Sequence, residues 1–308
     1  MMISVLVATK DRPNDIKRCL TSILQNTFHA YEVIIIDQSH THKTRKVIHT
    51  FKHSTVRYIS CLKGGKSYAL NVGIKLARGT ILAFTDDDCL VDKSWLKSIY
   101  TTFLDNTISG AFGRTLPHKP QAHANKICPC IFDKRSTSRI QTPVYHAIHI
   151  GFGNNMAFRT SIFDQIGGFN TLLGPGSIGS GAEDAEFTLR SLTHGIALIY
   201  DPTIVIYHNK WIAKQDMYKQ SLSYMCGEMA CYTLFALKKY PFAANIIRNN
   251  IRNSLSEIHT LVPFFKHQKK SQYFMNAYKT ILIQFFKIRG VFVGLLLYTR
   301  SAETITHR

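Results

Sequence analysis

The stretch TILAFTDDD, residues 80–88, decides the expected fold class. It is an apolar, β-branched run that ends in three consecutive carboxylates, Asp86, Asp87 and Asp88. A short apolar run of this kind is typical of a buried strand in a parallel sheet. From Gln38 to Thr85 the chain has nine Lys or Arg residues and no Asp or Glu, so the three acids stand in a basic neighbourhood. Clustered acids at the end of such a strand predict a ligand site.

Strand-like and helix-like segments alternate on both sides of this stretch. Short apolar runs at residues 3–9, 32–39 and 56–61 precede it, and apolar residues at helical spacing separate them. This order predicts an α/β fold, a Rossmann-like sheet with parallel neighbours flanked by helices. Ligands bind beyond the carboxyl ends of such strands. We therefore expect Thr9, Asp37 and the three acids to share one rim.

The rest of the chain is expected to complete this domain and then to change character. Residues 113–144 lack periodicity and predict long loops or lids, 147–169 predict a strand and a helix, and 196–208 predict a strand, a turn and a strand. The glycine-rich stretch before Glu183 predicts a mobile loop.

We expect a catalytic domain at 1–208 and a basic, mainly helical C-terminal extension at 209–308, with long helices at 217–240 and 273–287. The extension has 15 Lys or Arg residues against 4 acids.

Composition limits the function classes. The net charge of +19 favours anionic partners, which are nucleic acid, phosphorylated small molecules or an acidic membrane face. The seven cysteines are scattered without a CxxC pair, so neither a zinc ribbon nor a thioredoxin-like site is expected. The N-terminus has no basic region before its apolar run, and no uncharged apolar stretch long enough to span a bilayer is expected. These features predict a cytoplasmic protein, either free or peripheral on the inner face of the cell membrane.

The three acids suit a divalent cation. If they continued the strand, alternate side chains would share a face, so Asp86 and Asp88 would point one way and Asp87 the other. Two hard oxygen ligands at a strand end suit Mg²⁺ or Mn²⁺, which commonly complete their shell with substrate phosphates. The alternative interpretation is a solvated acidic turn that caps the next helix.

Other candidate residues each have a plain structural alternative. Asp37 ends a strand and can accept hydrogen bonds from a base or ribose, or from nearby backbone. Lys66 follows two glycines but lacks the spacing of a phosphate loop, so it either faces a diphosphate or is solvated. Glu183 and Asp184 begin a helix as caps or as a general base. His208 ends the last strand, as a metal ligand or as a structural histidine.

The ordered motifs resemble those of a known family. The segments ISVLVATKDRP, EVIIIDQS, KGGKSYALNVG, FTDDD, GFGNNMAFR, IGGF, GAEDAEF and YDPTIVIYH occur in the order found in bacterial family 2 glycosyltransferases of the GT-A fold. The match runs from about Ile3 to His208.

This resemblance assigns roles by position. Thr9 is similar to the wall of the nucleotide pocket, and Asp37 to the carboxylate that contacts the nucleobase. In the DxD motif Asp88 is the metal ligand and Asp86 contacts the ribose or a metal-bound water, with Asp87 beside them in the donor site.

Asp184 resembles the catalytic base of the family's ED motif, with Glu183 in a supporting or acceptor role. His208 stands where some members supply a metal ligand. Lys66 departs from the Arg found in many relatives.

The implied reaction is an inverting, Mn²⁺- or Mg²⁺-dependent transfer of a sugar to a hydroxyl of a glycan or lipid-linked acceptor. A UDP-sugar is the expected donor.

The basic extension, with alternating Lys, Arg and aromatic residues, suggests docking on an anionic membrane, while ordinary packing as core is the alternative. Two rival functions stay open. One is a basic nucleic-acid- or anion-binding protein, although no recognised nucleic-acid motif is present, and the other is a nucleotidyltransferase on a similar sheet.

Overall fold

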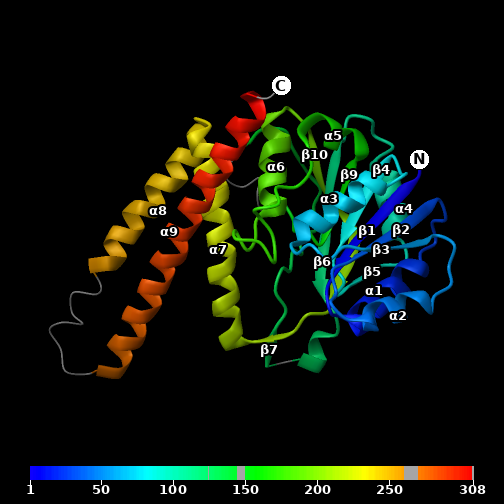
Figure 1. Cartoon of the computed structure of the whole chain (residues 1–308), viewed down its shortest axis with the longest axis horizontal. Helices are drawn as coiled ribbons and strands as arrows, with labels where there is room; N and C mark the ends of the chain where they lie inside the picture. Colours follow the sequence, from blue (N-terminus) through cyan, green and yellow to red (C-terminus); the bar gives the residue numbers. More distant parts are fainter. Residues whose placement is uncertain (124, 144–149, 260–269, 307–308) are drawn as a thin grey trace. The chain divides into compact units, whose positions relative to one another are not determined.

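The computed structural model describes residues 1–123, 125–143, 150–259 and 270–306. The chain forms two compact units (Figure 1). The first contains Met1–Thr171 and Glu183–Met217, and the second contains Leu172–Ala182 and Tyr218–Arg308. The expected domain boundary after residue 208 stays a prediction.

A mixed nine-stranded sheet forms the centre of the first unit, as expected for a GT-A fold. Its order is β3-β2-β1-β4-β9-β6-β10-β5, with β8 paired to β10. The strands are β1 (Ile3–Thr9), β2 (Tyr31–Asp37), β3 (Val56–Ser60), β4 (Ile81–Thr85), β5 (Cys89–Val91), β6 (Gly110–Pro117), β8 (Ser138–Ile140), β9 (Asn155–Arg159) and β10 (Leu198–His208). A separate small sheet pairs β7 (Lys126–Ile127) with β11 (Ile212–Ala213). The helices of this unit are α1 (Pro13–Leu24), α2 (His42–His49), α3 (Lys66–Leu76), the 3₁₀ turn η1 (Pro120–His123), α4 (Trp95–Thr102), α5 (Thr160–Ile166) and α6 (Glu183–Thr193).

The strand directions create the expected rim. β1 pairs in parallel with β2 and β4, and β2 pairs in parallel with β3. Thr9 lies opposite Asp37 in this register, at the carboxyl ends of β1 and β2. β9 runs antiparallel to β4, with Asn155 opposite Thr85, so the amino end of β9 reaches the same rim. The prediction that Thr9, Asp37 and the acid cluster share one edge is confirmed.

Two sequence expectations need correction. The expected loop region at 113–144 begins inside β6, which pairs with both β9 and β10. Residues 196–208 contain one continuous strand, β10, in place of a strand, a turn and a strand. Its pairing with β6 shifts register between Asp201 and Val205, so the segment expected to turn forms an irregularity within the strand. Residues 124 and 144 of the expected loop region, and residues 147–149 of the expected strand-and-helix segment, lie outside the described residues.

An aromatic cluster fixes α6 against the sheet. The ring centroid of Phe187 on α6 lies 5.0 Å from that of Phe158 on β9, 5.0 Å from Phe163 on α5 and 4.8 Å from Phe169. Phe187 is fully buried. Aromatic contacts of this kind add to the free energy gained by burial. The cluster therefore holds the first turn of α6, which begins at Glu183, in a defined position.

The second unit is helical. It contains most of α7 (Lys214–Leu237), together with α8 (Pro241–His259) and α9 (Lys270–Thr306). The expected helix at 273–287 is part of α9. An 18-residue window within Lys279–Arg300 has a mean hydropathy of 1.8, so this helix is long and apolar enough to cross a membrane by length and composition alone. Lys287 and Arg289 interrupt this segment, so it contains no uncharged stretch of 18 residues. The expectation that the chain has no spanning helix stays a prediction.

Candidate active site

Thr9 and Arg12 hold the centre of the acid cluster. The Thr9 hydroxyl donates a 2.7 Å hydrogen bond to Oδ2 of Asp87. Arg12 Nη1 lies 3.0 Å from Oδ1 of Asp87 and 3.3 Å from Oδ2 of Asp88. Burial raises the pKa of Asp87 to about 7, although the charge of Arg12 opposes the shift. One cation at the end of β1 thus offsets part of the repulsion between two adjacent carboxylates.

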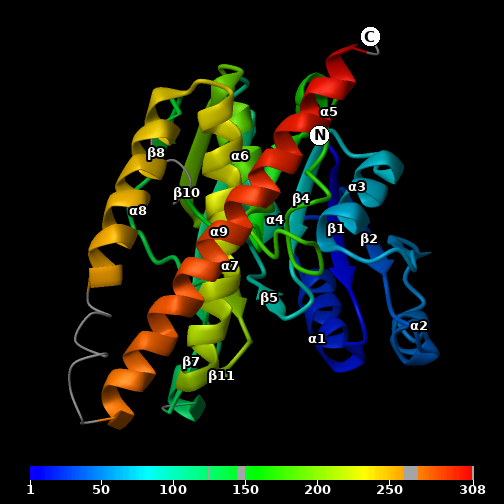
Figure 2. The same ribbon diagram turned by 60° about the vertical axis from the view of Figure 1, so that its left-hand side comes forward.

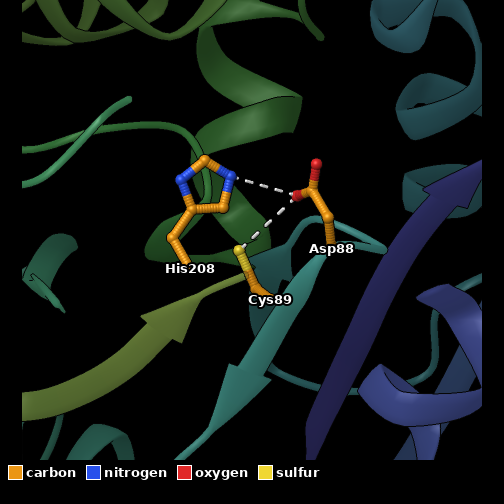
Figure 3. Close-up of side chains that lie close together, drawn as sticks. All are labelled: Asp88, Cys89 and His208. Atoms are coloured by element: carbon orange, nitrogen blue, oxygen red, sulfur yellow. Dashed lines mark hydrogen bonds and ion pairs between the residues drawn. The ribbon is translucent and has the colours of Figure 1, made fainter. Parts of the chain in front are cut away.

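Asp88 and His208 meet where β5 pairs with β10. Nε2 of His208 lies 3.3 Å from Oδ1 of Asp88, and both side chains are buried (Figure 3). Nδ1 of His208 donates a 2.7 Å hydrogen bond to the carbonyl oxygen of Pro129. Because Nδ1 carries a proton, Nε2 is the nitrogen that is free to bind a cation when the ring is neutral.

The same contacts shift both pKa values. Burial opposes ionisation of Asp88, but the hydrogen bond and charge of His208 and the charge of Arg12 lower the pKa of Asp88 to about 2. Burial opposes protonation of His208, but the bond to Asp88 raises the pKa of His208 to about 10. The metal-free pair is therefore a charged hydrogen bond. A divalent cation would replace the proton on Nε2.

Asp88, Cys89 and His208 fit a hard or borderline cation only in part. One donor atom from each residue lies within 4.8 Å of the others. A carboxylate oxygen and an imidazole nitrogen 3.3 Å apart have about the spacing of two neighbouring ligands of one ion. Burial raises the pKa of the Cys89 thiol well above its ordinary value, and a sulfur donor suits softer ions than Mg²⁺ or Mn²⁺. The residues present therefore fit a cation held by Asp88 and His208, with Cys89 as a neighbour.

Lys66 connects two acidic motifs that are far apart in the sequence. Its Nζ lies 2.5 Å from Oδ1 of Asp86 and 3.5 Å from Oε1 of Glu183. Burial opposes protonation of Lys66, but the charges of Asp86 and Glu183 raise its pKa well above the ordinary value. Burial also raises the pKa of Glu183 to about 7, against the effect of Lys66. The lysine is thus charged and nearly enclosed, contrary to the solvated alternative.

Asp184 is fixed by backbone groups. Its Oδ2 accepts a 2.6 Å hydrogen bond from the backbone N–H of Gly153, and its Oδ1 accepts a 2.8 Å bond from that of Ala185. Gly153 lies just before β9, at the rim. A Cβ atom at position 153 would lie 3.0 Å from the Asp184 side chain, so glycine permits this approach. The contact places the carboxylate of Asp184 at the same rim as the acid cluster.

Asp37 is buried and accepts hydrogen bonds from two neighbours. Its Oδ1 accepts a 2.9 Å hydrogen bond from the Ser39 backbone N–H, and its Oδ2 accepts a 3.0 Å bond from the Tyr58 hydroxyl. Among the described residues, we find no contact between its side chain and the acid cluster. Its place opposite Thr9 still puts it on the rim.

The structure therefore brings together most of the residues named from the sequence. Hydrogen bonds or ion pairs link Thr9 to Asp87, Lys66 to Asp86 and Glu183, and Asp88 to His208. The expected alternation of Asp86 and Asp88 on one face is wrong, because β4 ends at Thr85 and a turn follows. Sequence reasoning missed Arg12 as a site residue. The available signal was a basic residue in the short turn between the first strand and the first helix.

The comparisons with known proteins agree on one family. The sequence model described as "Glycosyl transferase family 2" matches residues 4–167, more than half of the chain. A curated relative from Haloferax volcanii, a glucosyl-dolichyl phosphate glucuronosyltransferase, is 24% identical over 184 residues, which cover 56% of this chain and 58% of that protein. The chain thus spans less than two thirds of the length of that relative.

Solved structures share the fold. The mannosyltransferase PcManGT from Pyrobaculum calidifontis, in complex with GDP-Man and Mn²⁺, is similar over 95% of this chain and 86% of its own, with a TM-score of 0.66 and 16% identity. Residues 1–349 of S. aureus TarS, in complex with UDP-GlcNAc, are similar over 75% of this chain and 66% of their own, with a TM-score of 0.53 and 19% identity. At these identities the similarity concerns the fold.

Proposed function

The chain belongs to glycosyl transferase family 2, and from this we propose that it transfers a sugar from a nucleoside-diphosphate donor to a hydroxyl acceptor, with inversion at the anomeric carbon. The observation that carries the proposal is the position of Lys66, which contacts both Asp86 and Glu183. The acids of the DxD motif and those of the ED motif therefore lie within reach of one side chain. Such an arrangement suits a site where donor and acceptor meet.

The donor side of the reaction uses the rim of β1, β2 and β4. Thr9 and Asp37 lie at strand ends where the nucleoside would bind, and Asp86 and Asp87 lie beside them. Asp88 and His208 would hold a divalent cation. When bound, this cation neutralises charge that develops on the leaving nucleoside diphosphate. A site with one carboxylate and one imidazole favours Mn²⁺ over Mg²⁺, because Mg²⁺ prefers oxygen ligands.

The acceptor side uses the first turn of α6. Asp184 would accept the proton of the attacking hydroxyl, because each of its oxygens keeps a lone pair beyond the backbone bond that it accepts. Those two bonds hold the carboxylate in one orientation, which lowers the entropic cost of the reaction. Glu183 supports this geometry through Lys66. The acceptor is a hydroxyl of a glycan or of a lipid-linked saccharide.

The donor is proposed to be a UDP-sugar. The two structural neighbours carry UDP-GlcNAc and GDP-Man, so GDP is the second candidate nucleotide. A panel of nucleoside diphosphates with Mn²⁺ or Mg²⁺, followed by thermal unfolding, identifies the preferred pair, because a bound ligand stabilises the folded state. We expect one nucleotide to raise the melting temperature only when the cation is present.

Two variants separate the proposed roles. Asp88→Asn should abolish both the metal-dependent nucleotide shift and sugar transfer. Asp184→Asn should abolish transfer but keep the nucleotide shift, because Asp184 acts on the acceptor. Asp164→Asn, at an exposed position of α5, is the matched control and should behave as wild type. Near-normal transfer by Asp184→Asn would refute the assignment of the base.

A further inference from the structure

The outer face of α9 is a continuous apolar stripe. Its members recur at intervals of three or four residues, and each is 41–63% exposed: Ile281, Phe285, Ile288, Phe292, Leu295 and Leu296. This spacing places them on one side of a helix. Exposed apolar patches of this extent mark sites that bind another apolar phase or molecule. The stripe covers about 22 Å along the helix axis, since each residue adds about 1.5 Å.

The opposite face of α9 is occupied inside the second unit. Val293 and Leu297 are buried with Ala230 and Leu234 of α7. A Cβ at Gly290 would lie 2.5 Å from the carbonyl oxygen of Cys226, so the two helices approach closely there. Figure 2 shows α7 and α9 within this unit. Packing therefore explains the inner face of α9 and leaves the outer stripe to be explained.

Side chains flanking the stripe are also engaged within the unit. Lys287 donates a 3.1 Å hydrogen bond to Ser254 on α8, and Arg289 donates a 2.7 Å bond to the carbonyl oxygen of Ile178. Both bonds direct charged groups toward the protein. Lys287 and Arg289 lie between Ile281 and Leu296 in the sequence, but none of the six stripe positions carries a charge.

The charge around the stripe selects the kind of partner. The second unit has thirteen Lys or Arg residues and three acids, a net charge of +10. Lys279 and Arg300 are exposed just before and just after the stripe, and Arg248 and Arg252 are exposed on α8. An apolar face bordered by cations is the pattern of a helix that lies in the interface of an anionic bilayer. Each nearby cation adds attraction to acidic headgroups.

We propose that the outer face of α9 binds the surface of an anionic membrane, with the helix axis along that surface. Self-association is disfavoured by the charge, because a second copy would bring another unit of net charge +10 against the first. Spanning is disfavoured because α7 and α8 pack beside α9, and insertion would carry the exposed Arg248 and Arg252 into hydrocarbon. The proposal concerns this surface and does not depend on the sugar-transfer chemistry.

Vesicle flotation with the whole chain tests the proposal. We expect the protein to float with vesicles of phosphatidylcholine plus phosphatidylglycerol, and to float much less with phosphatidylcholine alone or at high salt. The double variant Phe285→Ser, Phe292→Ser should lower partitioning onto the anionic vesicles by about tenfold or more, because two large apolar side chains no longer leave water. These side chains are 58% and 63% exposed, so the fold should tolerate their loss.

A matched control removes equally exposed apolar side chains from the first unit. Leu62→Ser, Leu104→Ser, at 67% and 56% exposure, should float as wild type. Circular dichroism confirms that both double variants are folded. Three results would overturn the proposal: no flotation of wild type, equal flotation of the α9 variant, or a dimer in sedimentation analysis that the α9 variant abolishes. Resistance of the bound protein to an alkaline wash would show a spanning helix and would also overturn it.

Discussion

Asp88 and His208 come from distant parts of the chain, yet Oδ1 of Asp88 lies 3.3 Å from Nε2 of His208. The contact follows from the pairing of β5 with β10, in which His208 lies opposite Cys89. The Pro129 carbonyl holds the far side of the imidazole ring. The sheet therefore presents one oxygen and one nitrogen to the same point, where either a proton or a cation can join them.

Replacing the imidazole should weaken cation binding. We expect His208→Gln to lower the affinity for Mn²⁺, measured by calorimetry in the presence of the preferred nucleotide, by about 10- to 100-fold or more. The reason is that one of the two protein ligands is lost. His194→Gln, at an exposed position at the end of α6, is the control and should keep wild-type affinity. Equal affinity in both variants would remove His208 from the proposed metal site.

The sequence was most informative where strands are buried on both faces. Nearly every residue of β1 and β2 is buried and most of them are apolar, and this pattern predicts a parallel strand. β6 could not be recognised in the same way, because it contains Gly110, Gly113 and Pro117. A Cβ at Gly113 would lie 2.2 Å from the Ile204 carbonyl oxygen, so the glycines of β6 reflect close packing between strands. Such packing depends on tertiary neighbours that a local pattern does not contain.

The site was predictable as a set of residues, but not in its internal contacts. The positions of Thr9, Asp37 and the acid cluster followed from the rule that ligands bind at strand ends. The pairing of Asp87 and Asp88 with Arg12 did not, because a turn after Thr85 sets the directions of these side chains. The backbone N–H of Cys89 donates a 3.1 Å bond to the carbonyl oxygen of Asp86, which closes this turn. Alternation along a strand no longer applies there.

Gly153→Ala should separate positioning from donor binding. The added Cβ would lie 3.0 Å from the Asp184 side chain and would displace the carboxylate from the Gly153 N–H. A small displacement of a catalytic group can lower the rate by about 100-fold, so we expect kcat to fall by roughly 10- to 100-fold. The KM for the donor should stay near the wild-type value, since the acid cluster is untouched.

Steady-state kinetics with varied donor and acceptor measure this separation. Gly64→Ala is the control, because a Cβ at that position would meet nothing within 4 Å. A wild-type kcat in Gly153→Ala would show that the Gly153 contact does not control the reactive position of Asp184.

Lys66 and Glu183 should be energetically coupled. Because burial already raises the pKa of Glu183 to about 7, the coupling is best measured at pH 9, where Lys66→Met leaves this buried carboxylate without its nearby cation and we expect the free energy of unfolding to fall by about 2–4 kcal/mol. The double variant Lys66→Met, Glu183→Gln should recover part of this loss, because the second change removes the unpaired charge. Urea unfolding of the four proteins in the cycle measures the coupling.

The exposed Lys93 supplies the control for loss of a lysine. Lys93→Met should change the free energy of unfolding by less than about 0.5 kcal/mol. Additive effects of the two changes at Lys66 and Glu183 would contradict the coupling.

Glu32 provides a prediction on pH that is independent of the proposed metal site. Its buried carboxylate accepts hydrogen bonds from Ser4 Oγ at 2.8 Å, Arg57 Nη1 at 2.7 Å and the Arg78 backbone N–H at 2.7 Å. Burial raises the pKa of Glu32, but these bonds outweigh it and lower the pKa below its ordinary value of 4.5. The carboxylate thus stabilises the fold above pH 4.5, and this contribution is lost as the pH falls through the lowered pKa.

Glu32→Gln should lower the free energy of unfolding by about 2 kcal/mol near neutral pH, because a charged acceptor is lost, and by much less in acid, where wild type is also uncharged. Urea unfolding across this range, with Asp164→Asn as the exposed control, would contradict the prediction if the difference between Glu32→Gln and wild type stayed constant with pH.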